Sequence, residues 1–209
     1  MITLKPKSDT SFIPITPNMV EGKDYIAIST ISKHKLGRAL AIGYTTNFKT
    51  VAGNVVSVKR FMEYIGMKDY PTKYLMQSKM KTADIRAVNK LETVDVPNYW
   101  AILTYAVCKR IQKDLGVQKM IKENTLPYTI VKWDKIDEEL QSIEGDKKCL
   151  VNMEKYATYL GIIRDIESLI KSDTFNTETI SNLIEYYKRD KNLDLFHRTA
   201  VILKEENEM

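Results

Sequence analysis

The chain of 209 residues has few residues of the kinds that bind metals or form disulfide bonds, with two histidines and two cysteines. His34 and His197 are far apart, and no group of carboxylates has the spacing of a metal-binding loop. Cys108 and Cys149 have no partner at a spacing typical of a redox motif or a zinc site, which predicts reduced thiols. The sequence therefore predicts no metal site, no disulfide and no cofactor.

The sequence also lacks long apolar segments and the common nucleotide-binding motifs. No segment approaches the roughly 20 apolar residues that cross a bilayer. The first residues lack the apolar run of a signal peptide, so we expect a cytoplasmic protein with no membrane partner. The motifs Gly-x-x-x-x-Gly-Lys-Ser, Gly-x-Gly-x-x-Gly and Gly-x-Ser-x-Gly are all absent. These absences argue against a nucleotide triphosphatase, a Rossmann enzyme and a nucleophile-elbow hydrolase.

The charge is distributed unevenly along the chain. Residues 1–96 hold 15 basic and 8 acidic residues, a balance of +7. Residues 97–134 hold 6 and 3, a balance of +3, and residues 135–209 hold 11 and 16, a balance of −5. One interpretation is a body that faces phosphate or nucleic acid, followed by an acidic helical appendage. The other is ordinary scatter with an acidic solvated face, and the charge counts leave both open.

Residue patterns predict an α+β fold, with a mostly helical body and a small sheet at 1–134 and an acidic helical appendage at 135–209 packed on it. We expect strands at 25–29, 48–51 and 128–133, and helices at 58–65, 72–81, 82–91, 97–115, 117–124, 136–143, 149–171, 176–189 and 193–203. Gly53 and Asn54 predict a turn, and Ser57 precedes the helix at 58–65 as its N-cap.

Three features are candidates for a binding site, and the first is the basic, glycine-containing loop at 32–38. Backbone N–H groups and basic side chains in such a loop attract anions. Arg38 can pair with phosphate through its guanidinium, and Phe48 can stack on a base. The alternative places Leu36 and Leu40 in the core, with Arg38 as an ordinary surface residue.

The second feature is the start of the helix at 58–65, which carries Lys59, Arg60 and Glu63. A carboxylate beside basic groups can serve as a general base or accept a hydrogen bond from a ribose hydroxyl. The alternative is a surface salt bridge between Lys59 and Glu63, one helical turn apart.

The third feature is the helix at 97–115, where Lys109 and Gln112 are three residues apart and share one face. Such a pair can hold a diphosphate and an amide-bearing base, although a solvated face has the same pattern. Trp100 or a neighbouring tyrosine can line a pocket near this helix or belong to the core.

In this order, the three features resemble the NADAR family, also called the YbiA-like family. The matching segments are Asn47-Phe48, then Gly53-Asn54-Val55-Val56-Ser57-Val58-Lys59, then Cys108-Lys109-Arg110-Ile111-Gln112, within residues 25–134. The resemblance implies a compact α+β domain that handles ADP-ribose-type N-glycosides. Members of the family cleave an N-glycosidic bond in early riboflavin intermediates or remove ADP-ribose from guanine in DNA.

The resemblance also implies roles for individual residues. Phosphates would be held by Arg38, Arg60 and Lys109, and a base would stack on Phe48 or Trp100. The other ligand-binding residues would be Asn47, Lys59 and Gln112. The catalytic residues would be Glu63 and Lys109. Lys59 stands where the family has a helix-start glutamate, and an ammonium group cannot replace a carboxylate base. N-glycosidase activity and binding without hydrolysis both remain open.

The size and lysine-rich composition resemble those of small accessory proteins of T-even-type phages. In that setting the chain is similar to a phage factor against toxins of the DarT type, and this resemblance implies a counter-defence protein, in the cytoplasm of an infected bacterial host, that neutralises a DNA ADP-ribosyltransferase toxin. Its partner would be the toxin or ADP-ribosylated DNA, with the acidic appendage facing a basic toxin. The alternatives are a nucleic-acid-binding accessory protein without catalytic activity and a structural scaffold protein. The sequence does not indicate an oligomeric state.

Overall fold

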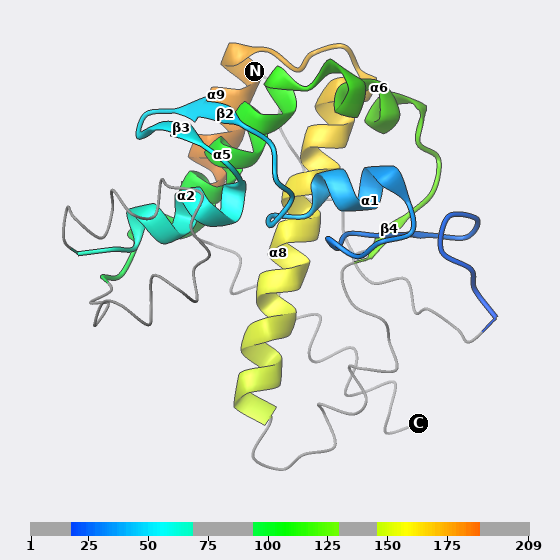
Figure 1. Ribbon diagram of the computed structural model, residues 1–209, viewed down its shortest axis with the longest axis horizontal. Helices are drawn as coiled ribbons and strands as arrows, with labels where there is room; N and C mark the ends of the chain where they lie inside the picture. The colour runs from blue at the N-terminus through cyan, green and yellow to red at the C-terminus, as the bar shows by residue number, and fades with distance from the viewer. Residues whose placement is uncertain (1–17, 69–93, 130–145, 189–209) are drawn as a thin grey trace.

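The computed structural model describes residues 18–68, 94–129 and 146–188, with side chains from residue 158 onward in the last range. The helices are α1 (Lys35–Leu40), α2 (Val58–Ile65), α5 (Tyr99–Lys113), α6 (Leu115–Glu123), α8 (Asp146–Lys171) and α9 (Thr177–Lys188), and the strands are β1 (Ile26–Ala27), β2 (Phe48–Thr50), β3 (Gly53–Val55) and β4 (Tyr128–Thr129) (Figure 1). The helices predicted at 72–81, 82–91, 136–143 and 193–203 lie outside the described residues.

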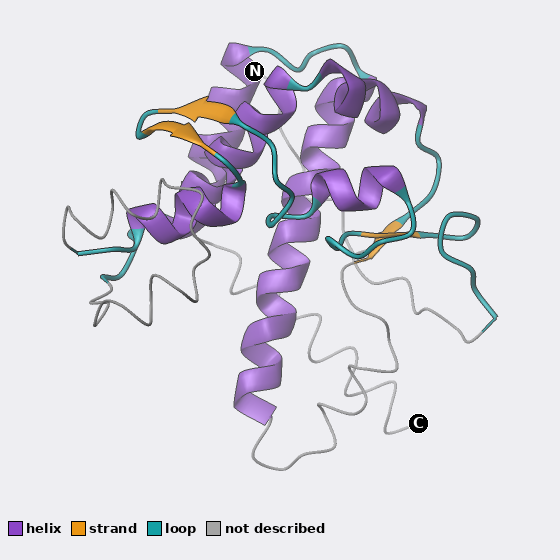
Figure 2. Ribbon diagram, viewed as in Figure 1, coloured by secondary structure: helices purple, strands orange, loops and turns teal. Residues whose placement is uncertain are grey.

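The described residues confirm an α+β fold that is mostly helical. Their strands form two separate pairs rather than one sheet (Figure 2). β1 and β4 are parallel, with Ile26 opposite Tyr128, whereas β2 and β3 form an antiparallel hairpin with Phe48 opposite Val55. The parallel pair joins the first described strand to the segment that follows α6.

The core lies between α5 and the two helices that follow later in the chain, α8 and α9 (Figure 1). One continuous cluster of buried side chains includes Leu40 of α1, Phe61 of α2, Val107 of α5, Ile163 of α8 and Leu183 of α9. Helices on both sides of residue 134 therefore share this core. The predicted boundary between body and appendage falls at 134–135, outside the described residues.

The prediction for α2 is confirmed at both ends. The Ser57 hydroxyl oxygen accepts a hydrogen bond from the backbone N–H of Arg60 at 3.1 Å, and the helix ends before Gly66. The buried residues Val58, Phe61 and Met62 repeat at the spacing of one helical face. Local signals suffice here because the cap, the apolar stripe and the stop all fall within ten residues.

α5 is the predicted helix at 97–115, shortened by two residues at each end. Leu103, Val107 and Ile111 are buried on the expected face. α6 begins at Leu115 rather than after Gly116, because Asp114 separates the two helices. The Asp114 carboxylate accepts a hydrogen bond from the backbone N–H of Val117 at 3.0 Å and caps α6.

The prediction of a loop through residue 38 is wrong, because α1 occupies Lys35–Leu40. Leu36, Ala39 and Leu40 have helical spacing and are buried. A Cβ atom on Gly37 would lie 2.1 Å from the carbonyl oxygen of Ala27, so this position needs glycine for the close approach of α1 to β1. The glycine that suggested a loop is therefore a packing requirement.

The prediction of a turn at Gly53 and Asn54 is also displaced. The chain turns at Val51 and Ala52, and Gly53 opens β3 opposite Thr50 with a positive φ of 95°. The Thr50 hydroxyl holds this turn, since it donates to the carbonyl oxygen of Gly53 at 3.0 Å and accepts from the N–H of Ala52 at 3.1 Å. Gly53 supplies the left-handed conformation that a residue with a side chain adopts only with strain.

Candidate functional site

The predicted anion-binding segment before α1 is occupied by a carboxylate of the chain itself. The Ser32 hydroxyl donates to Glu21, and the backbone N–H of Lys33 donates to the same carboxylate at 3.1 Å. Burial raises the pKa of Glu21, but its hydrogen bonds with the Ser32 hydroxyl and with three backbone N–H groups together outweigh it, so the pKa lies below its usual value. The segment does attract negative charge, and in this conformation Glu21 provides it.

Arg38 is half-buried and holds the same segment together from the other side. Its Nη1 atom donates to the carbonyl oxygens of Ser32 at 2.6 Å and Lys33 at 3.0 Å. Leu36 and Leu40 are fully buried. The burial of both leucines agrees with the alternative interpretation, in which they belong to the core.

The structure places the two candidate residues at the start of the hairpin in different environments. Phe48 is 1% exposed, so its ring has no open face for a base in this conformation. Asn47 is exposed, and its backbone carbonyl oxygen accepts a hydrogen bond from Nζ of Lys113 at 2.5 Å. The contact fixes the base of the hairpin against the last turn of α5.

The charged residues of α2 divide into a pair and a separate cation. Arg60 and Glu63 form an ion pair at 3.5 Å, and their side chains are 10% and 15% exposed. Lys59 is exposed, and its backbone N–H donates to the carbonyl oxygen of Ile42 at 2.8 Å. The carboxylate of Glu63 is thus engaged by Arg60, whereas Lys59, one turn earlier on α2, is exposed.

The three candidate residues on α5 are all half-buried, at different positions along the helix. Trp100 is half-buried against the core, with its ring edge-on to Tyr99 at a centroid distance of 5.1 Å. Lys109 and Gln112 are also half-buried. Nζ of Lys109 lies 5.9 Å from the ring centroid of Tyr105, a cation–π distance.

The structure brings α5 and the hairpin together through Tyr105, which the sequence interpretation considered only as a pocket-lining tyrosine, and Lys113, which it did not select. The Tyr105 hydroxyl accepts a hydrogen bond from the backbone N–H of Val51 at 3.1 Å, and Lys113 contacts Asn47. Tyr105, Lys109 and Lys113 are four residues apart in turn and form one stripe of α5 beside the hairpin. The sequence shows this four-residue spacing, but it does not show that the hairpin lies beside these residues.

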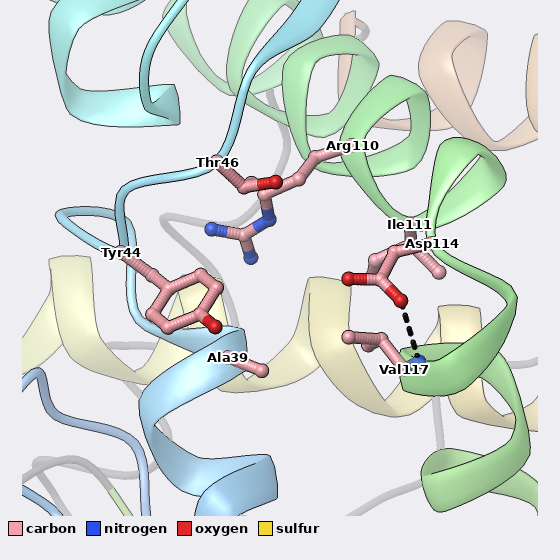
Figure 3. Close-up of a pocket in the computed structure, with 7 residues that line it drawn as sticks. All are labelled: Ala39, Tyr44, Thr46, Arg110, Ile111, Asp114 and Val117. Atoms are coloured by element: carbon pink, nitrogen blue, oxygen red, sulfur yellow. Dashed lines mark hydrogen bonds between the residues drawn. The ribbon is translucent and has the colours of Figure 1, made fainter.

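A narrow hollow lies where α1, the segment before the hairpin and α5 meet (Figure 3). Arg110, which is 3% exposed, extends into it beside Tyr44 and Thr46. The guanidinium donates to the carbonyl oxygens of Leu40 at 3.1 Å and Ala41 at 2.7 Å. Arg110 therefore closes the C-terminal end of α1.

Ion pairing separates two regions of the surface. On α6, α8 and α9, Lys119, Lys122, Lys171 and Lys188 each pair with a carboxylate. Within the described residues, Lys33, Lys35, Lys49, Lys59, Lys109 and Lys113 have no carboxylate within ion-pair distance. We call these six residues the unpaired lysines. They lie on or next to α1, the hairpin, α2 and α5, so uncompensated positive charge collects in this region.

Among the described residues, no group of three or more histidine, cysteine or carboxylate side chains is placed to hold a metal ion. The helices in this part of the chain include none with the length and apolar character needed to cross a membrane. No family model, curated protein or solved structure matches the chain. The assignment of function therefore depends on the residues and their geometry.

Proposed function

We propose that this protein is a phage-type counter-defence protein that neutralises a DarT-type DNA ADP-ribosyltransferase by binding ADP-ribosylated DNA. The observation that carries the proposal is the set of unpaired lysines around the hairpin, α2 and α5. DNA and ADP-ribose both present phosphates, and lysines without carboxylate partners are available to bind them. Two positions of the NADAR-like pattern, Lys59 and Lys109, belong to this set.

Two residues favour binding over hydrolysis of the N-glycosidic bond. The position of the family's helix-start glutamate is Lys59, which has no acceptor atom on its side chain. Glu63, the remaining carboxylate on α2, pairs with Arg60 and is largely covered. A general base must come within hydrogen-bond reach of the proton that it removes, and this one is engaged within the protein.

The proposal divides the predicted ligand-binding residues into two groups. Lys59, Lys109 and Gln112 are in positions to contact a ligand at the surface, and Trp100 retains a partly open ring for stacking. The second group consists of Arg38, Asn47, Phe48 and Arg60, whose observed contacts support the fold around this surface.

The test compares two duplexes of one sequence, with and without ADP-ribose on a single guanine. We expect tighter binding to the modified duplex and protection of DNA synthesis on that template from the toxin's effect. Mass spectrometry should detect no released ADP-ribose. Release that disappears in Glu63→Gln would replace the binding mechanism with N-glycosidase activity.

The same unpaired lysines also favour a second candidate, a nucleic-acid-binding accessory protein without a role against the toxin. It predicts equal affinity for the two duplexes and a toxin that stays active. A blocked toxin with no affinity for either duplex would instead show that the protein binds the toxin itself.

A further inference from the structure

The β2–β3 hairpin presents one face to solvent that differs sharply from the face on α5. Phe48 and Val55 point inward and are each 1% exposed. Lys49 and Asn54 lie opposite each other in the next register pair and are both exposed. At the turn, Val51 is 84% exposed. The outward face thus consists of a cation, an amide and, at the tip, an apolar side chain.

The hairpin is held in a fixed position on α5 at both ends. At the tip, Val51 donates its backbone N–H to the Tyr105 hydroxyl, and at the base Lys113 donates to the carbonyl oxygen of Asn47. Figure 2 shows the hairpin along α5, with its turn projecting past the helix. A ribbon anchored in this way loses little conformational entropy when it binds a partner.

We propose that this hairpin enters the major groove of duplex DNA, with Lys49 and Asn54 facing the base edges. The major groove is wide enough for a two-stranded ribbon. Lysine and asparagine are side chains that bind guanine and adenine edges there, and an apolar side chain such as Val51 contacts the thymine methyl group. Lys109 and Lys113 on α5 contact the flanking phosphates.

This inference rests on the proposed function for its choice of DNA as partner, and it adds the contact surface and the groove. A ribbon alone is not specific for DNA. Here the outward residues carry hydrogen-bond donors and positive charge without a carboxylate, which suits an acceptor-rich, anionic partner better than an apolar protein surface.

The experiment measures affinity for a duplex as a function of salt, with variants that separate phosphate contacts from groove contacts. Lys109→Gln should reduce the slope of log K against log salt by about 0.9. Val51→Ser and Asn54→Ala should weaken binding about tenfold, which corresponds to the loss of one good base contact, and leave the slope unchanged. Lys119→Gln on α6 is the matched control, because Lys119 is exposed and paired with Glu123.

Methylation of guanine N7, which lies in the major groove, should also lower the affinity. Melting temperatures of all variants identify any that fail to fold, which is not expected at exposed positions. Native-like binding by the Val51 and Asn54 variants, or indifference to N7 methylation, would overturn the groove assignment. Failure to bind any duplex would overturn both proposals.

The two proposals can fail separately. Hairpin-dependent binding to unmodified duplex, with no preference for ADP-ribose and an active toxin, would reject the proposed function and support the groove assignment. If binding is selective for the modified duplex and is unchanged in the hairpin variants, the result would support the proposed function and reject the groove assignment.

Discussion

Arg110 is a buried cation whose contacts are backbone carbonyl groups rather than a carboxylate. It donates to Leu40 and Ala41 at the end of α1, and the hydroxyl of Tyr159 on α8 donates to the same Leu40 oxygen at 2.6 Å. The C-terminal end of a helix carries partial negative charge, which favours a cation there. Three elements far apart in the sequence therefore meet at one polar point inside the core.

Replacement of this cation, Arg110→Met, should destabilise the protein by about 2–4 kcal/mol, because it leaves buried carbonyl oxygens with too few donors. Urea unfolding measures the difference. Lys113→Met is the matched control, since it removes a carbonyl contact at an exposed site on the same helix, and it should cost less than about 1 kcal/mol. Equal stability of the two variants would contradict a structural role for the Arg110 hydrogen bonds.

Glu21 makes stability depend on pH in a predictable direction. Its pKa in the folded protein is lower than the usual value of 4.5, so its ionised form stabilises the fold. This stabilisation is present above pH 4.5 and disappears as the pH falls through the folded pKa. Relative to Glu21→Gln, the native protein should be more stable at neutral pH and should lose that advantage under acid conditions.

Chemical unfolding at a series of pH values tests this dependence. Glu178→Gln serves as the control, because Glu178 is exposed in the first turn of α9. If the difference in stability between the native protein and Glu21→Gln stays constant from neutral to acid pH, the negative charge of Glu21 does not stabilise the fold.

At the scale of elements, the cap of α2 determines where the basic helix begins. Ser57→Ala removes the acceptor for the N–H of Arg60 and should cost about 1 kcal/mol. Ser181→Ala is the comparison, because the exposed Ser181 hydroxyl bonds back to Thr177 within α9 and caps nothing. Thermal unfolding of both variants gives the measurement, and an equal effect would argue against the cap.

α2 could be predicted because its cap, apolar residues and stop are close together in the sequence, and α5 because its apolar residues repeat at helical spacing. α1 could not, because its helix has one turn of apolar residues, Leu36 to Leu40, surrounded by basic residues and a glycine. The reason for Gly37 is the carbonyl oxygen of Ala27, a contact that only the folded chain reveals. The displaced hairpin turn has a similar cause, since Thr50 holds Val51 and Ala52 in the turn ahead of Gly53.

The candidate site was less predictable than the elements that carry it. The sequence indicated Lys109 from its position on α5, but the contacts that place α5 against the hairpin span 54 residues for Tyr105 and 66 residues for Lys113. The sequence interpretation offered Lys59 as the salt-bridge partner of Glu63, which is wrong because the structure pairs Glu63 with Arg60. Burial decided the question, because Arg60 faces the core and Lys59 faces solvent.

At the scale of the whole molecule, α9 packs along α5 and α8 also contacts α5, so the later helices complete the core of the earlier ones (Figure 1). Cys108 on α5 is fully buried, close enough to Tyr187 of α9 for the two groups to interact electrostatically. Burial raises the pKa of the Cys108 thiol to about 12, although Lys109 lowers it in part. The thiol therefore reports on whether α9 separates from α5.

With Cys149→Ser, Cys108 is the single thiol, and its reaction with a disulfide reagent measures how the core opens. The thiolate is the reactive form, so the folded protein should react only when the core unfolds. We expect the free energy of opening obtained from the labelling rate to equal the free energy of global unfolding obtained from urea titration. The helices on both sides of residue 134 would then unfold together.

A cysteine introduced at the exposed Ser181, in a chain without Cys108 and Cys149, provides the rate for a freely accessible thiol on α9. Labelling of Cys108 well below the global free energy would show that the later helices open while the body stays folded. That result would identify residues 135–209 as a separate unit, whereas agreement of the two free energies would make the hairpin, α5 and α9 parts of one cooperative structure.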